Sequence, residues 1–168
     1  MLFGAASPSY QLTLLCSNIL GMQATYRQKN LRKGRHSSPN QIYHITFTTK
    51  NRSPIFNSFH LARKAINIIK ISDDLAYTTT LAFLMMPDHI HWLIQLGNQA
   101  TLRQVIRSMK SQTSKAIGKP IWQAGYYDHA IRKDEDIVNI ARYIIANPVR
   151  AGLVKRVGDY PHWDAVWL

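Results

Sequence analysis

Two histidines stand two residues apart, at His89 and His91, within an apolar segment that is typical of a strand. Successive side chains of a β-strand leave opposite faces, so both imidazoles share one face while Ile90 and Trp92 point to the other. Two imidazoles placed in this way can share one divalent cation. A His-x-His pair is weak evidence by itself, because structural or incidental pairs are commoner. Here, however, the apolar neighbours already supply a face for the core, which leaves the histidine face for a polar role.

Near the C-terminal end, Tyr143 and Asn147 stand four residues apart in a segment with helical patterning. Residues at this spacing lie on one face of a helix, with roughly 6 Å between their Cβ atoms. A phenol and an amide oxygen therefore come together. The structural alternative is that Asn147 ends the helix before Pro148 and that Tyr143 only completes an amphipathic surface. Taken alone, this pair favours that alternative.

The elements that must position these residues follow from hydrophobic spacing and from turn and cap residues. Runs rich in aromatic and β-branched residues predict strands, and apolar residues at helical spacing predict helices. The predicted strands cover residues 43–49, 77–86, 89–96 and 127–131, and the predicted helices cover residues 59–71, 101–117 and 134–146. The order βαββαβα suits an α+β, ferredoxin-like fold: an antiparallel sheet of four to five strands with two helices on one face.

Charge is the second functional clue. The chain carries 21 Lys and Arg against 9 Asp and Glu, which gives a net charge of +12 and a pI near 10.1. A polyanion such as nucleic acid is the natural partner, although ribosomal and membrane-surface proteins share this composition. The candidate phosphate contacts are Arg27, Lys29, Arg32, Lys33 and Arg35 in a basic arm, and Arg103, Arg107 and Lys110 on the second predicted helix. A solvated linker and a solvated helix face are the alternatives.

One domain is expected from a chain of 168 residues, with a less organised N-terminal part. Residues 1–21 contain no charged side chain and are predicted to be a disordered tail, or to precede a natural start at Met22. Residues 22–40 form the basic arm, and residues 41–168 form the folded domain. The single cysteine, Cys16, fits a reducing, cytoplasmic setting. No apolar run reaches the roughly 18 residues that a membrane-spanning helix needs, so we expect a soluble protein without a membrane partner.

Three ordered segments resemble one known family. They are residues 86–92 (MPDHIHW), 122–132 (WQAGYYDHAIR) and 141–152 (ARYIIANPVRAG). All three look like signature blocks of the REP-associated tyrosine transposases of bacteria, which belong to the single-tyrosine HUH class. The resemblance extends from about Tyr26 to the C-terminus, so it covers everything except the uncharged tail.

The resemblance implies a site and a reaction. The paired metal ligands fall on His89 and His91, the nucleophile on Tyr143, and the amide that completes the metal site on Asn147, where related transposases often carry Gln. Mg²⁺ or Mn²⁺ is the implied metal. The implied reaction is nicking of single-stranded DNA through a 5′-phosphotyrosine, followed by strand transfer. The remaining histidines outside the three blocks are interpreted as incidental: His36, His44, His60 and His162.

The implied partner is single-stranded or hairpin DNA with REP-like palindromes, and the implied oligomeric state is a monomer, with a dimer as the alternative. Asp128 and His129 match the family's middle block, and we give them an accessory role at most. Three other functions stay open: a hairpin-binding factor without cleavage, a metal-dependent nuclease in which water attacks, and an RNA-binding module. The last should show RNP-like glycine patterns, which the sequence does not contain. Tyr126 or Tyr127 is the alternative nucleophile.

Overall fold

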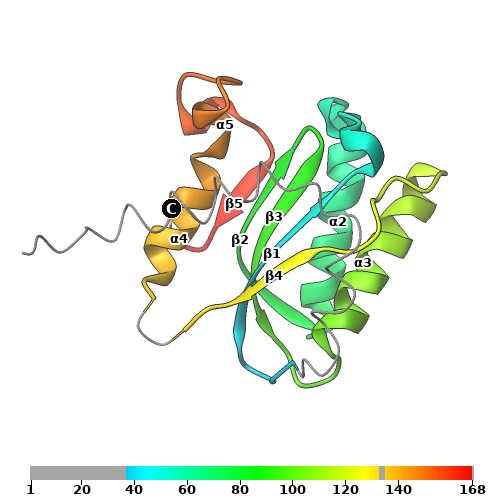
Figure 1. Ribbon diagram of the computed structural model, residues 1–168, viewed down its shortest axis with the longest axis vertical. Helices are drawn as coiled ribbons and strands as arrows, with labels where there is room; N and C mark the ends of the chain where they lie inside the picture. The colour runs from blue at the N-terminus through cyan, green and yellow to red at the C-terminus, as the bar shows by residue number, and fades with distance from the viewer. Residues whose placement is uncertain (1–36, 133–134, 168) are drawn as a thin grey trace, which may run out of the picture. The chain divides into compact units, whose positions relative to one another are not determined.

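A five-stranded antiparallel sheet with helices on both faces forms the centre of the computed structural model, which describes residues 37–132 and 135–167 (Figure 1). Its strands are β1 (Ile42–Thr48), β2 (Thr78–Met86), β3 (His89–Leu96), β4 (Tyr127–Ala130) and β5 (Trp163–Ala165). The order across the sheet is β4-β1-β3-β2-β5. The first four strands confirm the predicted α+β, ferredoxin-like fold, and β5 extends the sheet beyond β2. The predicted tail and all but the last residues of the predicted basic arm lie outside the described residues.

Two helices cover one face of the sheet and a third covers part of the other (Figure 1). The helices are α2 (Phe59–Asp74), α3 (Leu102–Ile117), α4 (Ile137–Ile145) and α5 (Asn147–Arg150), with 3-10 turns at Lys50–Arg52, Ile55–Asn57 and Val157–Asp159. α3 begins at a reciprocal cap between Thr101 and Gln104, and it ends at Gly118, whose φ of 87° a glycine adopts without steric cost. No helix in the described ranges is long and apolar enough to cross a membrane.

Side-chain alternation along β3 divides the sheet into an apolar face and a mixed face. Ile90 and Trp92 are fully buried under α2 and α3, in the larger of two cores. The indole Nε1 of Trp92 donates to Thr80 Oγ1 at 2.9 Å, so its polar atom is satisfied inside this core. The residues between them, His89 and His91, lie on the opposite face, as the spacing predicts.

The apolar side of α4 packs on β2 and β5, on the same face of the sheet as the histidines. Its buried residues are Ile140, Ala141, Ile144 and Ile145, and they share a second core with Leu84 of β2 and Leu93 of β3. The hydroxyl of Tyr160 donates to the Met85 carbonyl at 2.7 Å and fastens the segment that leads into β5. α4 therefore covers the β2 side of this face, and the part formed by β1, β3 and β4 carries polar side chains.

We predict that Gly97→Ala lowers the free energy of unfolding by about 1–3 kcal/mol, the usual cost of an extra carbon atom in a filled space. A Cβ at Gly97 would collide with the Ala76 carbonyl oxygen, and its amide already donates to the Tyr77 carbonyl at 2.9 Å. Urea unfolding measures the change. Gly158→Ala is the control, because a Cβ there meets nothing within 4 Å. Equal stability of the two variants would contradict this close packing at the end of β3.

Candidate functional site

His89 and His91 lie side by side at the start of β3, with ring centroids 5.0 Å apart and the rings nearly perpendicular. In the sheet register Thr48 lies opposite His89 and Thr46 lies opposite His91, so these four residues share one face. His44, two residues before Thr46, belongs to the same face. The spacing of the histidines therefore places them in a polar neighbourhood that β1 supplies.

His91 is buried, and one of its ring nitrogens is engaged by β1. Its Nδ1 lies 3.2 Å from Nε2 of His44 and 3.2 Å from Oγ1 of Thr46, and the two imidazoles stack at 5.4 Å. Burial, followed by the charges of His89, His44 and Arg150, holds the pKa of His91 well below its usual value. A neutral imidazole is the form that binds metals, and partners on Nδ1 leave Nε2 as its ligand atom.

His44, which the sequence marks as incidental, is the partner that His91 needs. Burial, and to a lesser extent the charge of His129, lowers the pKa of His44 to about 4, so both stacked rings are neutral at pH 7. One neutral ring can then donate to the other. The signal for this role is the alternation along β1, in which His44 and Thr46 are polar between the apolar residues Tyr43, Ile45 and Phe47.

His89 has a carboxylate partner in the turn that precedes it. Its Nδ1 lies 2.5 Å from Oδ1 of Asp88, whose Oδ2 accepts from Nη1 of Arg52 at 3.1 Å. Burial raises the pKa of Asp88, but the hydrogen bonds and charges of His89 and Arg52 outweigh it, and the net shift is downward. A carboxylate on Nδ1 fixes the orientation of an imidazole and leaves Nε2 as the other ring nitrogen. The sequence marks Asp88 only as a turn residue.

Tyr143 and Asn147 sit on consecutive helices rather than on one. The predicted helix over residues 134–146 begins later, because Asp136 caps it by accepting from the Asn139 amide at 3.0 Å, and it ends at Ile145. Asn147 opens α5, and its Nδ2 donates to the Ile144 carbonyl at 2.8 Å. Its Oδ1 accepts from Arg150 Nη2 at 2.7 Å. Tyr143 and Asn147 are both half-buried.

The donor set fits a divalent cation only with a neutral oxygen ligand. Within residues 37–132 and 135–167, no group of three or more His, Cys, Asp or Glu is arranged to hold a metal ion. His89 and His91 supply two imidazoles whose Nδ1 atoms are engaged by the protein. Asn147 Oδ1 is the candidate third ligand, and a carbonyl oxygen has a second lone pair besides the one that Arg150 uses. The ligand roles of all three residues stay predictions.

The middle segment of the resemblance supplies residues to both faces of the sheet. His129 lies opposite His44, on the histidine face, and its Nε2 is 3.0 Å from Oε2 of Glu135. Asp128 lies opposite Ile45, so it belongs to the face that α2 and α3 cover. This placement separates Asp128 from the histidines. The accessory roles of Asp128 and His129 stay predictions.

The two tyrosines before Asp128 also divide between the faces. Tyr127 pairs with Thr46 on the histidine face, whereas Tyr126 packs against the larger core. Tyr127 is therefore the stronger alternative nucleophile of the two.

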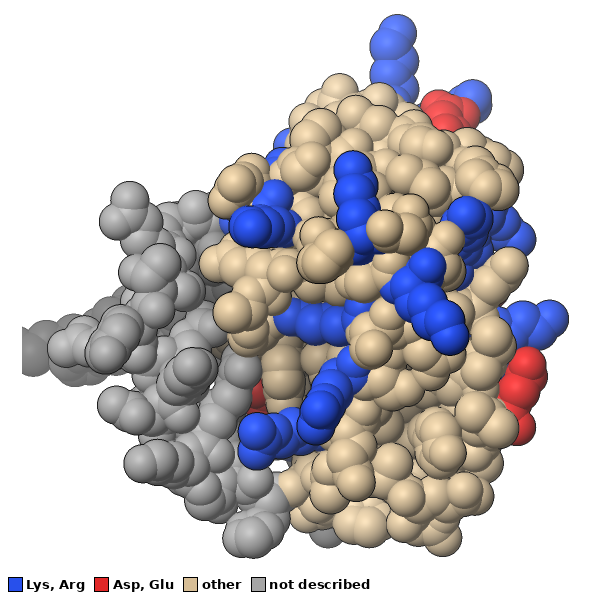
Figure 2. All heavy atoms as spheres, turned by 90° about the vertical axis from the view of Figure 1, so that its right-hand side faces the viewer, with Lys and Arg blue, Asp and Glu red and all other residues tan. Residues whose placement is uncertain are grey.

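The predicted basic helix α3 exposes Arg103 and Arg107. The Nζ of Lys110 instead donates to the carbonyls of Gln123, at 2.9 Å, and Gly125, so its ammonium fastens the loop before β4. Figure 2 looks onto the side of the molecule that α3 occupies in Figure 1 and shows Lys and Arg side chains spread over it, with few acidic ones. Arg27, Lys29, Arg32, Lys33 and Arg35 lie outside the described residues.

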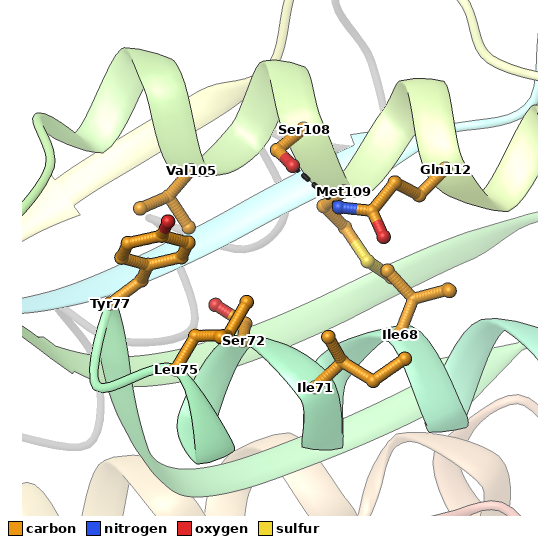
Figure 3. A pocket seen from close by; sticks show the side chains of 9 residues that line it. All are labelled: Ile68, Ile71, Ser72, Leu75, Tyr77, Val105, Ser108, Met109 and Gln112. Atoms are coloured by element: carbon orange, nitrogen blue, oxygen red, sulfur yellow. Dashed lines mark hydrogen bonds between the residues drawn. The ribbon is translucent and has the colours of Figure 1, made fainter.

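A pocket between α2 and α3 is separate from this site (Figure 3). Ile71 and Leu75 line it from α2, Val105 and Met109 line it from α3, and Tyr77 closes one end. The pocket lies on the side of the sheet that α2 and α3 cover, and its lining offers no carboxylate, imidazole or amine. It therefore lacks the groups that the predicted chemistry needs.

We predict that the metal-free protein, in excess EDTA, loses stability as the pH falls from 6.5 toward 4. Unfolded His44 has a pKa of 6.5 and folded His44 a pKa of about 4, so between these values the unfolded chain binds the extra proton. The loss at pH 5 should be on the order of 2 kcal/mol from this residue, and His91 adds to it. Urea unfolding at several pH values measures it. His44→Gln should flatten the pH dependence, and His60→Gln, at an exposed position, should not; equal slopes in the two variants would contradict the account.

The sequence is similar to a known family and to individual proteins of that family. The family model described as "Transposase IS200 like" matches residues 37–147. A REP-associated tyrosine transposase of Escherichia coli is 33% identical over 122 residues, which are 70% of this chain and 72% of the relative. A putative REP-associated tyrosine transposase of Haemophilus influenzae is 34% identical over 99 residues, which are 49% of this chain and 56% of the relative.

A solved structure agrees with these relatives. The REP-associated tyrosine transposase bound to a REP hairpin has a TM-score of 0.65 and 29% identity to this chain. The match covers 84% of this chain and 82% of that one. The family match, the relatives and the shared fold agree: this chain belongs to the IS200-like transposases, a family of DNA-processing enzymes, in the branch of the REP-associated tyrosine transposases.

Proposed function

We propose that this chain nicks single-stranded DNA by attack of Tyr143 on a phosphodiester and then transfers the cut strand. The observation that carries the proposal is that α4, the helix that bears Tyr143, packs on the same face of the sheet that presents His89 and His91. Family membership supports DNA as the substrate class. The histidine pair and the tyrosine support cleavage over binding alone.

His89, His91 and Asn147 would hold Mg²⁺ or Mn²⁺. A divalent cation, when bound, neutralises charge on a non-bridging phosphate oxygen and orients the phosphorus. The protein prepares the site from its own residues. His44 and Thr46 hold Nδ1 of His91, Asp88 holds Nδ1 of His89, and the depressed pKa keeps the His91 imidazole neutral.

In the proposed reaction the phenol of Tyr143 loses its proton and Oη attacks the phosphorus. The bond from phosphorus to O3′ breaks, O3′ takes up a proton, and the 5′ phosphate stays on Tyr143. Because the phosphodiester energy is kept in this link, the 3′-hydroxyl of a second strand can reverse the attack and join the strands without ATP. Nicking and strand transfer are thus one reaction run in both directions.

The proposed substrate is a folded single strand with a REP-like hairpin, met in the cytoplasm by a monomer. A relative with 29% identity was solved bound to a REP hairpin, which supports this substrate class. Exposed Arg103 and Arg107 of α3 offer charges for the phosphate backbone, and we assign the same task to the basic residues at 27–35. Lys110 is a weaker candidate for a phosphate contact, because its ammonium already donates to two carbonyls.

We predict that Tyr143→Phe abolishes cleavage and the covalent adduct while hairpin binding stays within about twofold of wild type, since only one hydroxyl is removed. The substrate is a single-stranded hairpin with its flanking sequence, with Mg²⁺ or Mn²⁺, and a denaturing gel resolves the products. Tyr127→Phe is the matched control, because Tyr127 lies on the same face. It should keep the adduct.

Each other outcome selects a different function. An adduct that persists in Tyr143→Phe and disappears in Tyr127→Phe would move the nucleophile to β4. Cleavage without any adduct would establish a nuclease in which water attacks. A wild-type protein that binds the hairpin but never cuts it with either metal would be a binding factor.

His89→Ala and His91→Ala should each lower cleavage at least a hundredfold, because the imidazole donors of the cation site are lost. Unlike Tyr143→Phe, they should recover partly when Mn²⁺ is raised, since the nucleophile is intact. Cleavage rates across a Mn²⁺ series measure this.

A duplex of the same sequence should resist cutting, and equal rates on duplex and single strand would contradict the proposed substrate.

A further inference from the structure

Arg150 joins the residues of α4 and α5 that the proposed reaction uses. Its Nη2 donates to Asn147 Oδ1 at 2.7 Å and to the Tyr143 carbonyl at 2.9 Å. Its guanidinium carbon lies 3.7 Å from the centroid of the Tyr143 ring, which is a cation–π contact. Its charge is also felt at His91, whose pKa it helps to lower. One guanidinium therefore contacts both the candidate nucleophile and a candidate ligand.

A helix-closing role accounts for only part of this arrangement. Arginine near a helix C-terminus commonly binds the last carbonyls, and the bond to the Tyr143 carbonyl is of that kind. Arg150 is nevertheless exposed, and the described residues give it no ion pair with a carboxylate. Both hydrogen bonds that the described residues accept from Arg150 leave from Nη2, so the N–H groups of Nε and Nη1, which point in different directions, can each donate to a ligand.

The bond to Arg150 also sets the orientation of Asn147. The amide Nδ2 faces the carbonyls of Ile144 and Tyr143, at 2.8 and 3.4 Å, and Oδ1 faces the guanidinium. Guanidinium has no acceptor atom, so only the oxygen of the amide can occupy that side. Arg150 thereby presents the oxygen that a cation would bind.

We propose that Arg150 binds the scissile phosphate through a free guanidinium N–H while Tyr143 attacks it, an inference that rests on the function proposed above. Attack builds negative charge on the non-bridging oxygens, and a guanidinium N–H can donate a charge-assisted hydrogen bond to one of them. The bond from Tyr143 Oη to phosphorus forms and the bond to O3′ breaks, while Arg150 keeps its protons throughout. Arg150 is then a catalytic residue for the phosphate and a positioning residue for Asn147.

The test compares a native hairpin strand with one that carries a methylphosphonate at the cleavage site. The methyl group replaces one charged oxygen and leaves that position neutral. Each strand is titrated with wild type, Arg150→Gln and Arg142→Gln in excess EDTA, so that binding is read without metal. Cleavage rates with Mn²⁺ are measured separately. Arg142 is the matched control, because it is an exposed arginine of α4 and loses the same charge.

Wild type and Arg142→Gln should prefer the native strand in the EDTA titration, and Arg150→Gln should lose most of that preference. With metal, Arg150→Gln should slow cleavage of the native strand roughly tenfold to a hundredfold, the worth of one charge-assisted hydrogen-bond contact. On the neutral strand its deficit relative to wild type should shrink to about threefold or less. A residue that only closes a helix would slow both strands equally.

Equal losses on the two strands, or the same behaviour in Arg150→Gln and Arg142→Gln, would overturn the inference while leaving the proposed function intact. A wild type that makes no covalent product from the native strand would overturn both. Arg150→Lys covers the case in which the Gln variant fails to fold, as thermal unfolding would reveal. It keeps the positive charge and should therefore retain part of the preference for the native strand; complete loss of that preference in a folded Lys variant would contradict the inference.

Discussion

The alternation of side chains across β1 and β3 is the constraint on which the site depends. Every second residue of these strands enters the large core under α2 and α3, where Trp92 and Ile90 have no exposed surface. Because the strand period is two, this burial holds His89, His91, His44 and Thr46 on the other face. A slip of one residue in the register would bury the histidines in the apolar core and expose the indole, so the stability of the core and the placement of the site have one cause.

The uneven cover of the second face makes that placement useful. α4 packs its apolar side on β2 and β5, which leaves the polar side chains of β1, β3 and β4 beside it. The same packing places α4, which bears Tyr143, on the histidine face, and Arg150 links α4 to α5 through the Tyr143 carbonyl and Asn147. A helix that covered the whole face would satisfy the core and close the site.

Much of this arrangement is predictable from the sequence, for physical reasons that also mark where prediction ends. Long strands and helices carry many residues of one period, so residues 89–96 and 101–117 were predicted within one residue of the observed bounds. β5 has only three residues and no pattern of its own. The predicted start of α4, at residue 134, is too early, because the sequence does not distinguish the cap at Asp136 from the other polar residues near it.

The sequence does not predict which side chains of different elements contact one another. From the sequence His44 is interpreted as incidental, although the alternation along β1 assigns its side chain to one face of the sheet. Its stacking on His91 depends on the register between β1 and β3, because the two histidines are 47 residues apart in sequence. Arg150 lies inside a recognised motif, yet its contact with the Tyr143 ring depends on the break between α4 and α5.

The identity of the nucleophile is the central claim, and peptide mapping of the protein–DNA adduct tests it most directly. Wild type is incubated with a single-stranded REP-like hairpin and Mn²⁺, digested with trypsin and a nuclease, and analysed by mass spectrometry. The account predicts a 5′-linked nucleotide on the fragment that spans residues 143–150, attached to Tyr143. A nucleotide on the fragment that carries Tyr126 and Tyr127, or cleaved DNA with no linked peptide, would contradict it.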